Sequence, residues 1–198
     1  MRRLPLLCAL LPLAAAAQLG IPSAPGAPAY LPRAVFLGAY SNNTAFTPQL
    51  RVQWELTLLQ TPHDAFVGIA EVGGGWGLGN LPRNVSLTGG DMTYFYQHAF
   101  LAGVAYRATY PNGFHWGFHF ATGPLAYGGN ITDTGAERRL GMTVEGRVQF
   151  GIQAGPFVFG LSGGWAQLYD FPQDSLTAIF TGGPIGGAFL DWRPLPAR

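Results

Sequence analysis

The stretch Met142-Thr-Val-Glu-Gly-Arg-Val-Gln-Phe-Gly-Ile-Gln153 decides the fold, because its side chains alternate in character along its whole length. The even-numbered positions are apolar or Gly, and the odd-numbered positions carry Thr143, Glu145, Arg147, Gln149, Gly151 and Gln153. Successive side chains of a β-strand point to opposite faces, so this period of two predicts a strand with one apolar face and one polar face.

The same alternation recurs along the chain. Residues 50–58 place Leu50, Val52, Trp54, Leu56 and Leu58 opposite Arg51, Gln53, Glu55 and Thr57. Residues 114–120 place Phe114, Trp116, Phe118 and Phe120 opposite His115, Gly117 and His119. Eight strand-like segments follow from this pattern, at roughly 33–42, 49–60, 65–78, 92–109, 114–126, 138–154, 157–169 and 177–193.

The connections between these segments alternate in length. Tight turns are expected at 61–64, 111–113 and 155–156, where Pro, Asn, Asp and Gly gather. Longer polar connections are expected at 43–48, 79–91, 127–137 and 170–176. Short turns on one side and long loops on the other are typical of outer-membrane barrels. The sequence therefore predicts an all-β fold, an eight-stranded antiparallel up-and-down transmembrane β-barrel with short periplasmic turns and longer external loops. Pro184, inside the last segment, predicts a bulge there.

The N-terminus has the features of an export signal. Two arginines precede an apolar run that is too short to span a bilayer as a helix, and Ala-rich residues follow it. We expect a cleaved signal peptide at 1–17, a Pro/Ala-rich leader at 18–32, the barrel at 33–193 and a tail at 194–198. The single cysteine, Cys8, lies in the signal, so the mature domain has no disulfide or thiolate metal site.

Composition narrows the class of protein further. Charged residues are 11% of the chain, below the roughly 25% of soluble domains, while aromatic residues reach 14% and Gly numbers 29. The chain contains no lysine, and without Arg2 and Arg3 the 11 basic residues fall to nine against 10 acidic ones. This balance does not favour nucleic acid as a partner.

The few charges within strands share one property: each lies opposite its strand's apolar side chains. Facing lipid, an arginine near the bilayer midplane would cost roughly 2–4 kcal/mol, so these charges are expected to face inward and pair. An eight-stranded barrel has an interior that side chains just fill. The sequence therefore predicts a packed polar lumen of balanced charge rather than a wide pore, with its network formed by Arg51, Glu55, Glu71, Arg107, Glu145 and Arg147.

Aromatic residues near the strand ends predict two interfacial girdles. The girdle at the long-loop ends would contain Tyr40, Trp76, Tyr94, Tyr96, Trp165 and Tyr169. The girdle at the short-turn ends would contain Tyr106, Tyr110, Trp116 and Trp192.

With its signal, its loop order and its alternating strands from 33 to 193, the chain resembles the small bacterial outer-membrane barrel families of the outer membrane protein A, X, W and opacity types. The resemblance implies a place in the outer membrane of a Gram-negative bacterium, with outer-membrane lipid, lipopolysaccharide and the barrel assembly machinery as partners. One feature departs from these families, which usually end on an aromatic residue: here Phe189 and Trp192 are followed by residues 193–198.

Several functions fit such a barrel. The first is a structural or surface-interaction role through the loops at 79–91 and 127–137, and the second is a narrow channel for small or apolar solutes. Two further alternatives are a lipid-modifying enzyme and a soluble lipocalin-like binder. The binder would have apolar residues inside its barrel and charges outside. Catalytic residues, a metal site and a cofactor are not expected. His115 and His119 would lie about 13 Å apart along one strand, too far apart for one metal ion, no His-x-Ser motif is present, and Ser162 has no His partner in the sequence.

Overall fold

A computed structural model describes residues 31–41, 46–77, 92–131, 135–170 and 182–192, with only the backbone described at 92–96, 129–131, 135–139 and 170. All regular structure in these ranges is β. The strands are β1 (Ala34–Ser41), β2 (Phe46–Gln60), β3 (Asp64–Gly77), β4 (Met92–Thr109), β5 (Phe114–Ile131), β6 (Gly135–Ala154), β7 (Phe157–Asp170) and β8 (Gly183–Trp192).

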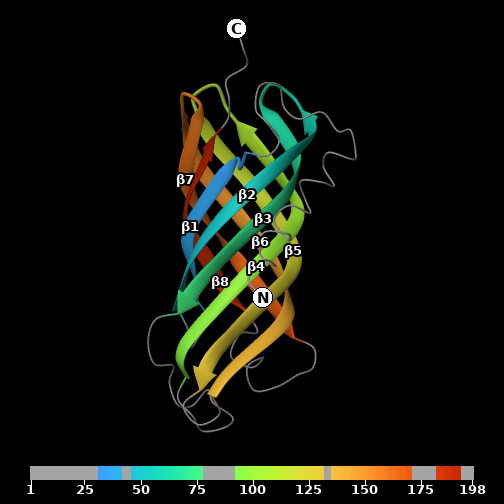
Figure 1. Cartoon of the computed structure of the whole chain (residues 1–198). Coiled ribbons are helices and arrows are strands. Elements are labelled where there is room, and N and C mark those ends of the chain that lie inside the picture. Colours follow the sequence, from blue (N-terminus) through green and yellow to red (C-terminus); the bar gives the residue numbers. More distant parts are fainter. Residues whose placement is uncertain (1–30, 42–45, 78–91, 132–134, 171–181, 193–198) are drawn as a thin grey trace.

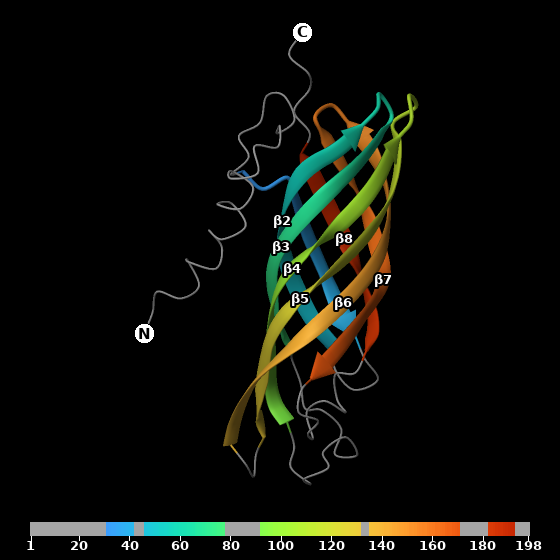
Figure 2. The same cartoon turned by 90° about the vertical axis from the view of Figure 1, so that its right-hand side faces the viewer.

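The eight strands form one closed antiparallel barrel in which each strand pairs with its neighbours in the sequence and β1 pairs with β8 (Figures 1 and 2). The closing seam runs from Ala34 opposite Asp191 to Tyr40 opposite Ile185. The predicted eight-stranded, antiparallel, up-and-down barrel is therefore confirmed as a fold.

Two of the predicted connections are wrong in their bounds. The connection expected at 127–137 is mostly strand, because β5 continues to Ile131 and β6 begins at Gly135, with Gly128 paired to Arg138. The Gly and Asn residues there suggested a loop, yet their backbones continue the ladder between the two strands. The connection expected at 43–48 is also partly strand, because β2 begins at Phe46. The start expected for the last strand, at 177, lies outside the described residues, and β8 is described from Gly183.

The bulge expected at Pro184 is also wrong, since the β7–β8 register runs without a shift from Ala166 opposite Gly183 to Phe157 opposite Trp192. Pro184 is the second residue of β8 and pairs with Trp165, while the ladder to β1 starts one residue later. A proline is tolerated at such a position because no β1 residue is paired with it. Register shifts occur instead between Thr57 and Leu59 and between Met92 and Tyr94.

The hairpins β2–β3, β4–β5 and β6–β7 lie together at one end of the barrel, the upper end in Figure 1, which we call the short-turn end. Gly113, with φ of +84°, closes the β4–β5 turn by donating its N–H to the Tyr110 carbonyl at 2.9 Å. Gly155, with φ of +59°, precedes Pro156 in the two-residue β6–β7 turn, where a type II′ hairpin requires Gly.

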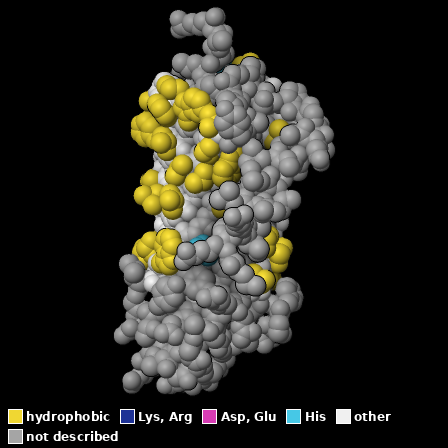
Figure 3. All heavy atoms as spheres, in the orientation of Figure 1, with side chains coloured by type: hydrophobic (Ala, Val, Ile, Leu, Met, Phe, Trp, Pro, Cys, Tyr) yellow, Lys and Arg dark blue, Asp and Glu magenta, His cyan; other side chains and the backbone are white. Residues whose placement is uncertain are grey.

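The two faces of the wall differ in character. Large apolar side chains are exposed on the outside of every strand, among them Leu37, Leu50, Phe66, Val104, Phe118, Phe150, Leu161 and Leu190. Figure 3 shows hydrophobic side chains over much of the described part of one face. The interior holds the buried Arg, Glu and His side chains together with two apolar clusters. This distribution is the reverse of the one that a lipocalin-like binder would have.

Candidate functional site: an ion-pair network inside the barrel

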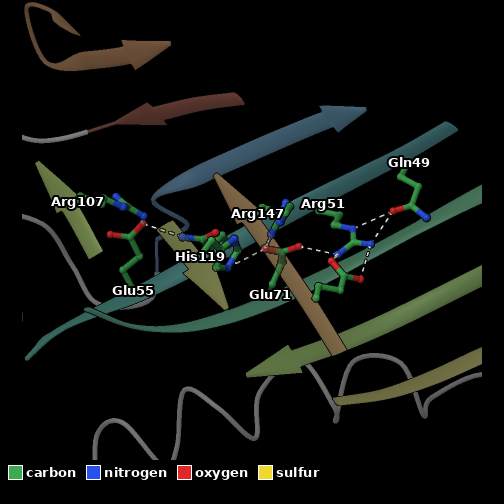
Figure 4. A network of polar contacts seen from close by, with 9 residues as sticks. Gln49, Arg51, Glu55, Glu71, Arg107, His119 and Arg147 are labelled. Atoms are coloured by element: carbon green, nitrogen blue, oxygen red, sulfur yellow. Dashed lines mark hydrogen bonds and ion pairs between the residues drawn. The ribbon is translucent and has the colours of Figure 1, made fainter. Parts of the chain in front are cut away.

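Arg51, on the inner face of β2, is the centre of the first group of charges, which we call the middle cluster (Figure 4). Its Nη1 donates to Glu71 Oε1 at 3.0 Å and to Glu145 Oε2 at 2.6 Å, and its Nη2 donates to Glu145 Oε1 at 2.9 Å. Gln49 Oε1 accepts from Nε at 3.0 Å and from Nη2 at 2.6 Å. A guanidinium has five N–H donors, so all of them are used.

Glu71, on β3, connects this arginine to Arg147 on β6. Its Oε2 accepts from Arg147 Nη2 at 2.5 Å, while its Oε1 accepts from Arg51. The Arg147 guanidinium also lies over the Phe36 ring, 4.9 Å from the ring centroid. Arg51, Glu71, Glu145 and Arg147 are all buried, and the two positive charges balance the two negative ones.

A second group of charges, which we call the turn-end cluster, lies nearer the short-turn end. Arg107 on β4 donates to Glu55 through Nη2 and to Asp191 Oδ2 through Nη1 at 2.5 Å. Gln53 Nε2 donates to Glu55 Oε1 at 2.8 Å. The side chains of Glu55, Arg107 and Asp191 are nearly inaccessible to solvent.

The structure thus places all six charged residues of the predicted network inside the barrel, in two clusters. It adds Asp191, which the sequence analysis did not include. With Asp191 the described interior contains three Arg and four carboxylates, so its charge is not balanced as predicted. The alternation of the last strand could have identified Asp191, because it lies on the same inward face as Ile185, Gly187 and Phe189.

The interior is less polar than predicted, because two apolar clusters flank the charges. One is formed on β3, β4, β5 and β7 by Val67, Ile69, Ala99, Leu101, Ala105, Ala121, Leu125, Tyr127 and Leu168. The other, on β1, β7 and β8, is formed by Phe36, Tyr40, Val158, Ala166, Ile185 and Phe189. The ion pairs are therefore screened from water by apolar side chains, which strengthens their electrostatic interaction.

Most residues of the two predicted girdles have outward-facing side chains. Trp76, Tyr110, Trp165 and Tyr169 are exposed, and Tyr106, Trp116 and Trp192 are half-buried. On the outer surface the Tyr106 hydroxyl donates to Asp64 Oδ1 at 2.8 Å, and its ring packs against Trp116. The side chains of Tyr94 and Tyr96 lie outside the described residues.

Tyr40 is a correction to that set. It is only 5% exposed and belongs to an interior apolar cluster. Its position explains why, since β1 directs Phe36, Gly38 and Tyr40 inward and places Val35, Leu37 and Ala39 outside. Nearness to a strand end suggested a girdle residue, but parity within the strand sends the ring into the lumen.

The interior histidines differ in their contacts. His115 Nδ1 lies 2.9 Å from Thr109 Oγ1, and the His115 ring packs against Phe189. Both ring nitrogens of His119 are buried and have no hydrogen-bond partner within the described part of the protein. The nearest carboxylate oxygen is Glu71 Oε2, 3.7 Å from His119 Nε2.

A small cavity lies against the middle cluster, bordered by Tyr40, Arg51, Gln97, Leu125, Thr143, Glu145, Ala166 and Leu168. Its volume of about 20 Å³ is enough for one water molecule. Within the described ranges no group of three or more His, Cys, Asp or Glu is placed to hold a metal ion. The same residues include no helix long and apolar enough to span a membrane.

Comparisons with known proteins add neither a family nor a relative to these observations. No protein-family model matches the chain, and neither the curated proteins nor the solved structures that were searched contain a match.

Proposed function

We propose that this chain is an integral outer-membrane β-barrel whose lumen is closed by its ion-pair network, and that it has a structural or surface-interaction role rather than an enzymatic one. The observation that carries the proposal is the distribution of side chains across the wall. Charges that would be expected on the surface of a soluble domain are buried, and large apolar side chains are exposed around the barrel.

The energetics of the two solvents support a lipid surrounding. Soluble monomers rarely expose contiguous apolar patches larger than a few hundred Å². In lipid the same surface is solvated, and the closed ladder leaves no backbone edge unpaired at the seam between β1 and β8. Lipid, lipopolysaccharide and the barrel assembly machinery are then the expected partners. The loop at 79–91, proposed as an interaction surface, lies outside the described residues.

The contents of the lumen favour a closed barrel over a channel. Ion pairs from β2, β3 and β6 cross the interior, and apolar side chains pack on both sides of them. A narrow channel for small or apolar solutes is the second candidate, because the cavity beside Thr143 leaves one part of the interior unfilled.

Cell fractionation and gel mobility test the membrane proposal. The full chain, expressed with its N-terminal segment, should sediment with outer membranes, resist extraction by urea or carbonate, and run faster on gels when it is not boiled. A deletion of residues 2–17 serves as the control and should leave the protein in the cytoplasm. Recovery of the full chain as a soluble periplasmic protein would contradict the proposal.

Planar-bilayer recordings separate a closed barrel from a channel. The purified barrel should show no stable large conductance, only small or rare openings. A persistent conductance whose ion selectivity changes in Glu145→Gln or Arg147→Gln would instead establish the narrow channel.

A further inference from the structure

His119 is a buried interior residue, and neither of its ring nitrogens has a hydrogen-bond partner among the described residues. It lies on β5 between the two clusters, with Glu55 and Arg107 on one side and Glu71 and Arg147 on the other (Figure 4). Its side chain is 2% exposed. A neutral imidazole has one donor and one acceptor nitrogen, and in this position neither has a partner among the described residues.

We propose that His119 is an acid sensor for the interior, and that uptake of a proton by its imidazole breaks the contact between Glu71 and Arg147 and loosens the barrel. The geometry gives the reason. His119 and Arg147 are paired residues on adjacent strands, and both approach the same oxygen, Glu71 Oε2, at 3.7 Å and 2.5 Å. A protonated imidazole gains a second N–H donor and competes with Arg147 for that oxygen.

The charges around His119 determine the direction of the effect. The charges that act on His119 are carried by Arg147 on β6, Glu71 on β3, Arg107 on β4 and Arg51 on β2. The other charged groups of the interior, Glu145, Glu55 and Asp191, pair with these arginines, and His115 lies on the same strand as His119. The middle cluster is already balanced, with two arginines and two glutamates. The excess carboxylate of the interior belongs to the other cluster, where Glu55 and Asp191 share Arg107. A third cation at Glu71 must therefore use the oxygen that Arg147 already occupies, which couples protonation to the opening of an existing pair.

The responding pH range follows from the chemistry of the side chain. In an unfolded chain imidazole titrates near 6.5 and carboxylates near 4, so unfolding becomes linked to proton uptake by a histidine at a higher pH than to uptake by the carboxylates. If the folded barrel holds His119 neutral and the unfolded chain does not, unfolding takes up a proton below about pH 6.5. Stability then falls as the pH falls, and the unfolding constant rises by up to about tenfold for each pH unit.

The experiment measures urea unfolding of the purified barrel in detergent micelles between pH 8 and pH 5. The wild-type barrel should show a falling midpoint below pH 6.5, and His119→Gln, which removes the titrating group, should flatten that profile. His98→Gln is the matched control, because His98 is exposed on the outer surface, and it should keep the wild-type profile. His115→Gln tests the other buried imidazole.

Two results would overturn the inference. One is a wild-type midpoint that does not change between pH 8 and pH 5, which requires no variant to fold. The other is a pH profile that persists in His119→Gln or disappears only in His115→Gln. Unfolding of the purified barrel measures its stability and not its location in the cell. Failure here therefore leaves the outer-membrane proposal untouched, and failure in fractionation leaves this inference untouched. In bilayers, the wild-type barrel should open more often at pH 5 than at pH 7.5, and His119→Gln should not.

Discussion

The interior network predicts that its arginines are unequal, and replacing each by methionine, which is apolar and of similar length, measures the difference. Arg51 binds two carboxylates and Gln49, whereas Arg147 has Glu71 as its carboxylate partner and Phe36 as its aromatic neighbour. We therefore expect Arg51→Met to be more destabilising than Arg147→Met.

The magnitudes follow from what each substitution leaves behind. Within the described residues Arg51 is the only cation in contact with Glu145, so Arg51→Met leaves a buried carboxylate without a counter-ion. Breaking a buried pair in this way costs about 3–5 kcal/mol. Arg147→Met leaves Glu71 with Arg51, so the loss is closer to that of one charged hydrogen bond, about 1.5–3 kcal/mol. Arg33→Met is the control, because Arg33 is half-exposed at the short-turn end.

Urea unfolding in lipid vesicles, followed by tryptophan fluorescence, gives the free energies of unfolding for comparison. The double variant Arg51→Met/Glu145→Gln should recover part of the loss, because the carboxylate that Arg51→Met leaves alone becomes neutral. Equal midpoints for Arg51→Met and Arg33→Met would refute the interpretation of the middle cluster. So would a double variant that is less stable than the wild type by the full sum of the losses of Arg51→Met and Glu145→Gln.

Three further outcomes are expected from unfolding measurements under the same conditions. Gly164→Ala should be destabilising and Gly146→Ala nearly neutral, because a Cβ at Gly164 would overlap the Gly146 carbonyl oxygen while one at Gly146 meets open space; equal effects would mean that the wall can shift at no cost. Leu161→Arg should cost about 2–4 kcal/mol in lipid, since Leu161 is 70% exposed near the middle of β7, and no loss in vesicles would argue against a lipid-facing surface. Asp191→Asn should lower the free energy of unfolding less than Arg107→Met, because the first leaves Arg107 paired with Glu55 and the second leaves two carboxylates without their arginine. The opposite order would contradict the excess negative charge of the turn-end cluster.

Much of the fold could be predicted because parity in a strand is a strong local rule. Once the apolar face of residues 142–153 was assigned to the outside, Glu145 and Arg147 had to face inward, and the structure places both there. The same rule accounts for Arg51 and Glu71 on their own strands. Each such assignment uses only residues a few positions apart, so it does not require knowledge of how the barrel closes.

The partners within the network could not be predicted, because they depend on how the strands are staggered around the barrel. Arg51 and Glu145 are 94 residues apart, and Arg107 and Asp191 are 84 residues apart. No local pattern relates such positions, since the register of every intervening strand contributes to their relative height. For the same reason the place of His119, between the two clusters, was not visible in the sequence.

The errors at 127–137 and at Tyr40 have a common source in the sequence analysis. Both assignments relied on residue type, taking Gly and Asn as loop formers and a tyrosine near a strand end as a girdle residue. In a closed barrel the ladder between neighbouring strands determines where a strand ends, and β5 and β6 remain paired out to Ile131 and Gly135. Hydrogen bonding over a long ladder outweighs the modest propensities of a few residues.

The arrangement of the interior also explains how a chain without a disulfide in its barrel could hold its closing seam. Asp191 is the residue before the last of β8, and its partner Arg107 lies on β4, across the barrel from the seam. Arg107 in turn binds Glu55 on β2, so the turn-end cluster connects β2, β4 and β8. Of these contacts, the one between Arg107 and Asp191 joins β4 to the last strand. The contact of Arg107 with Glu55 and those of Arg51 and Arg147 with Glu71 join strands that precede β7. The turn-end cluster therefore contains an ion pair to the closing strand, whereas the ion pairs of the middle cluster join strands that come earlier in the chain.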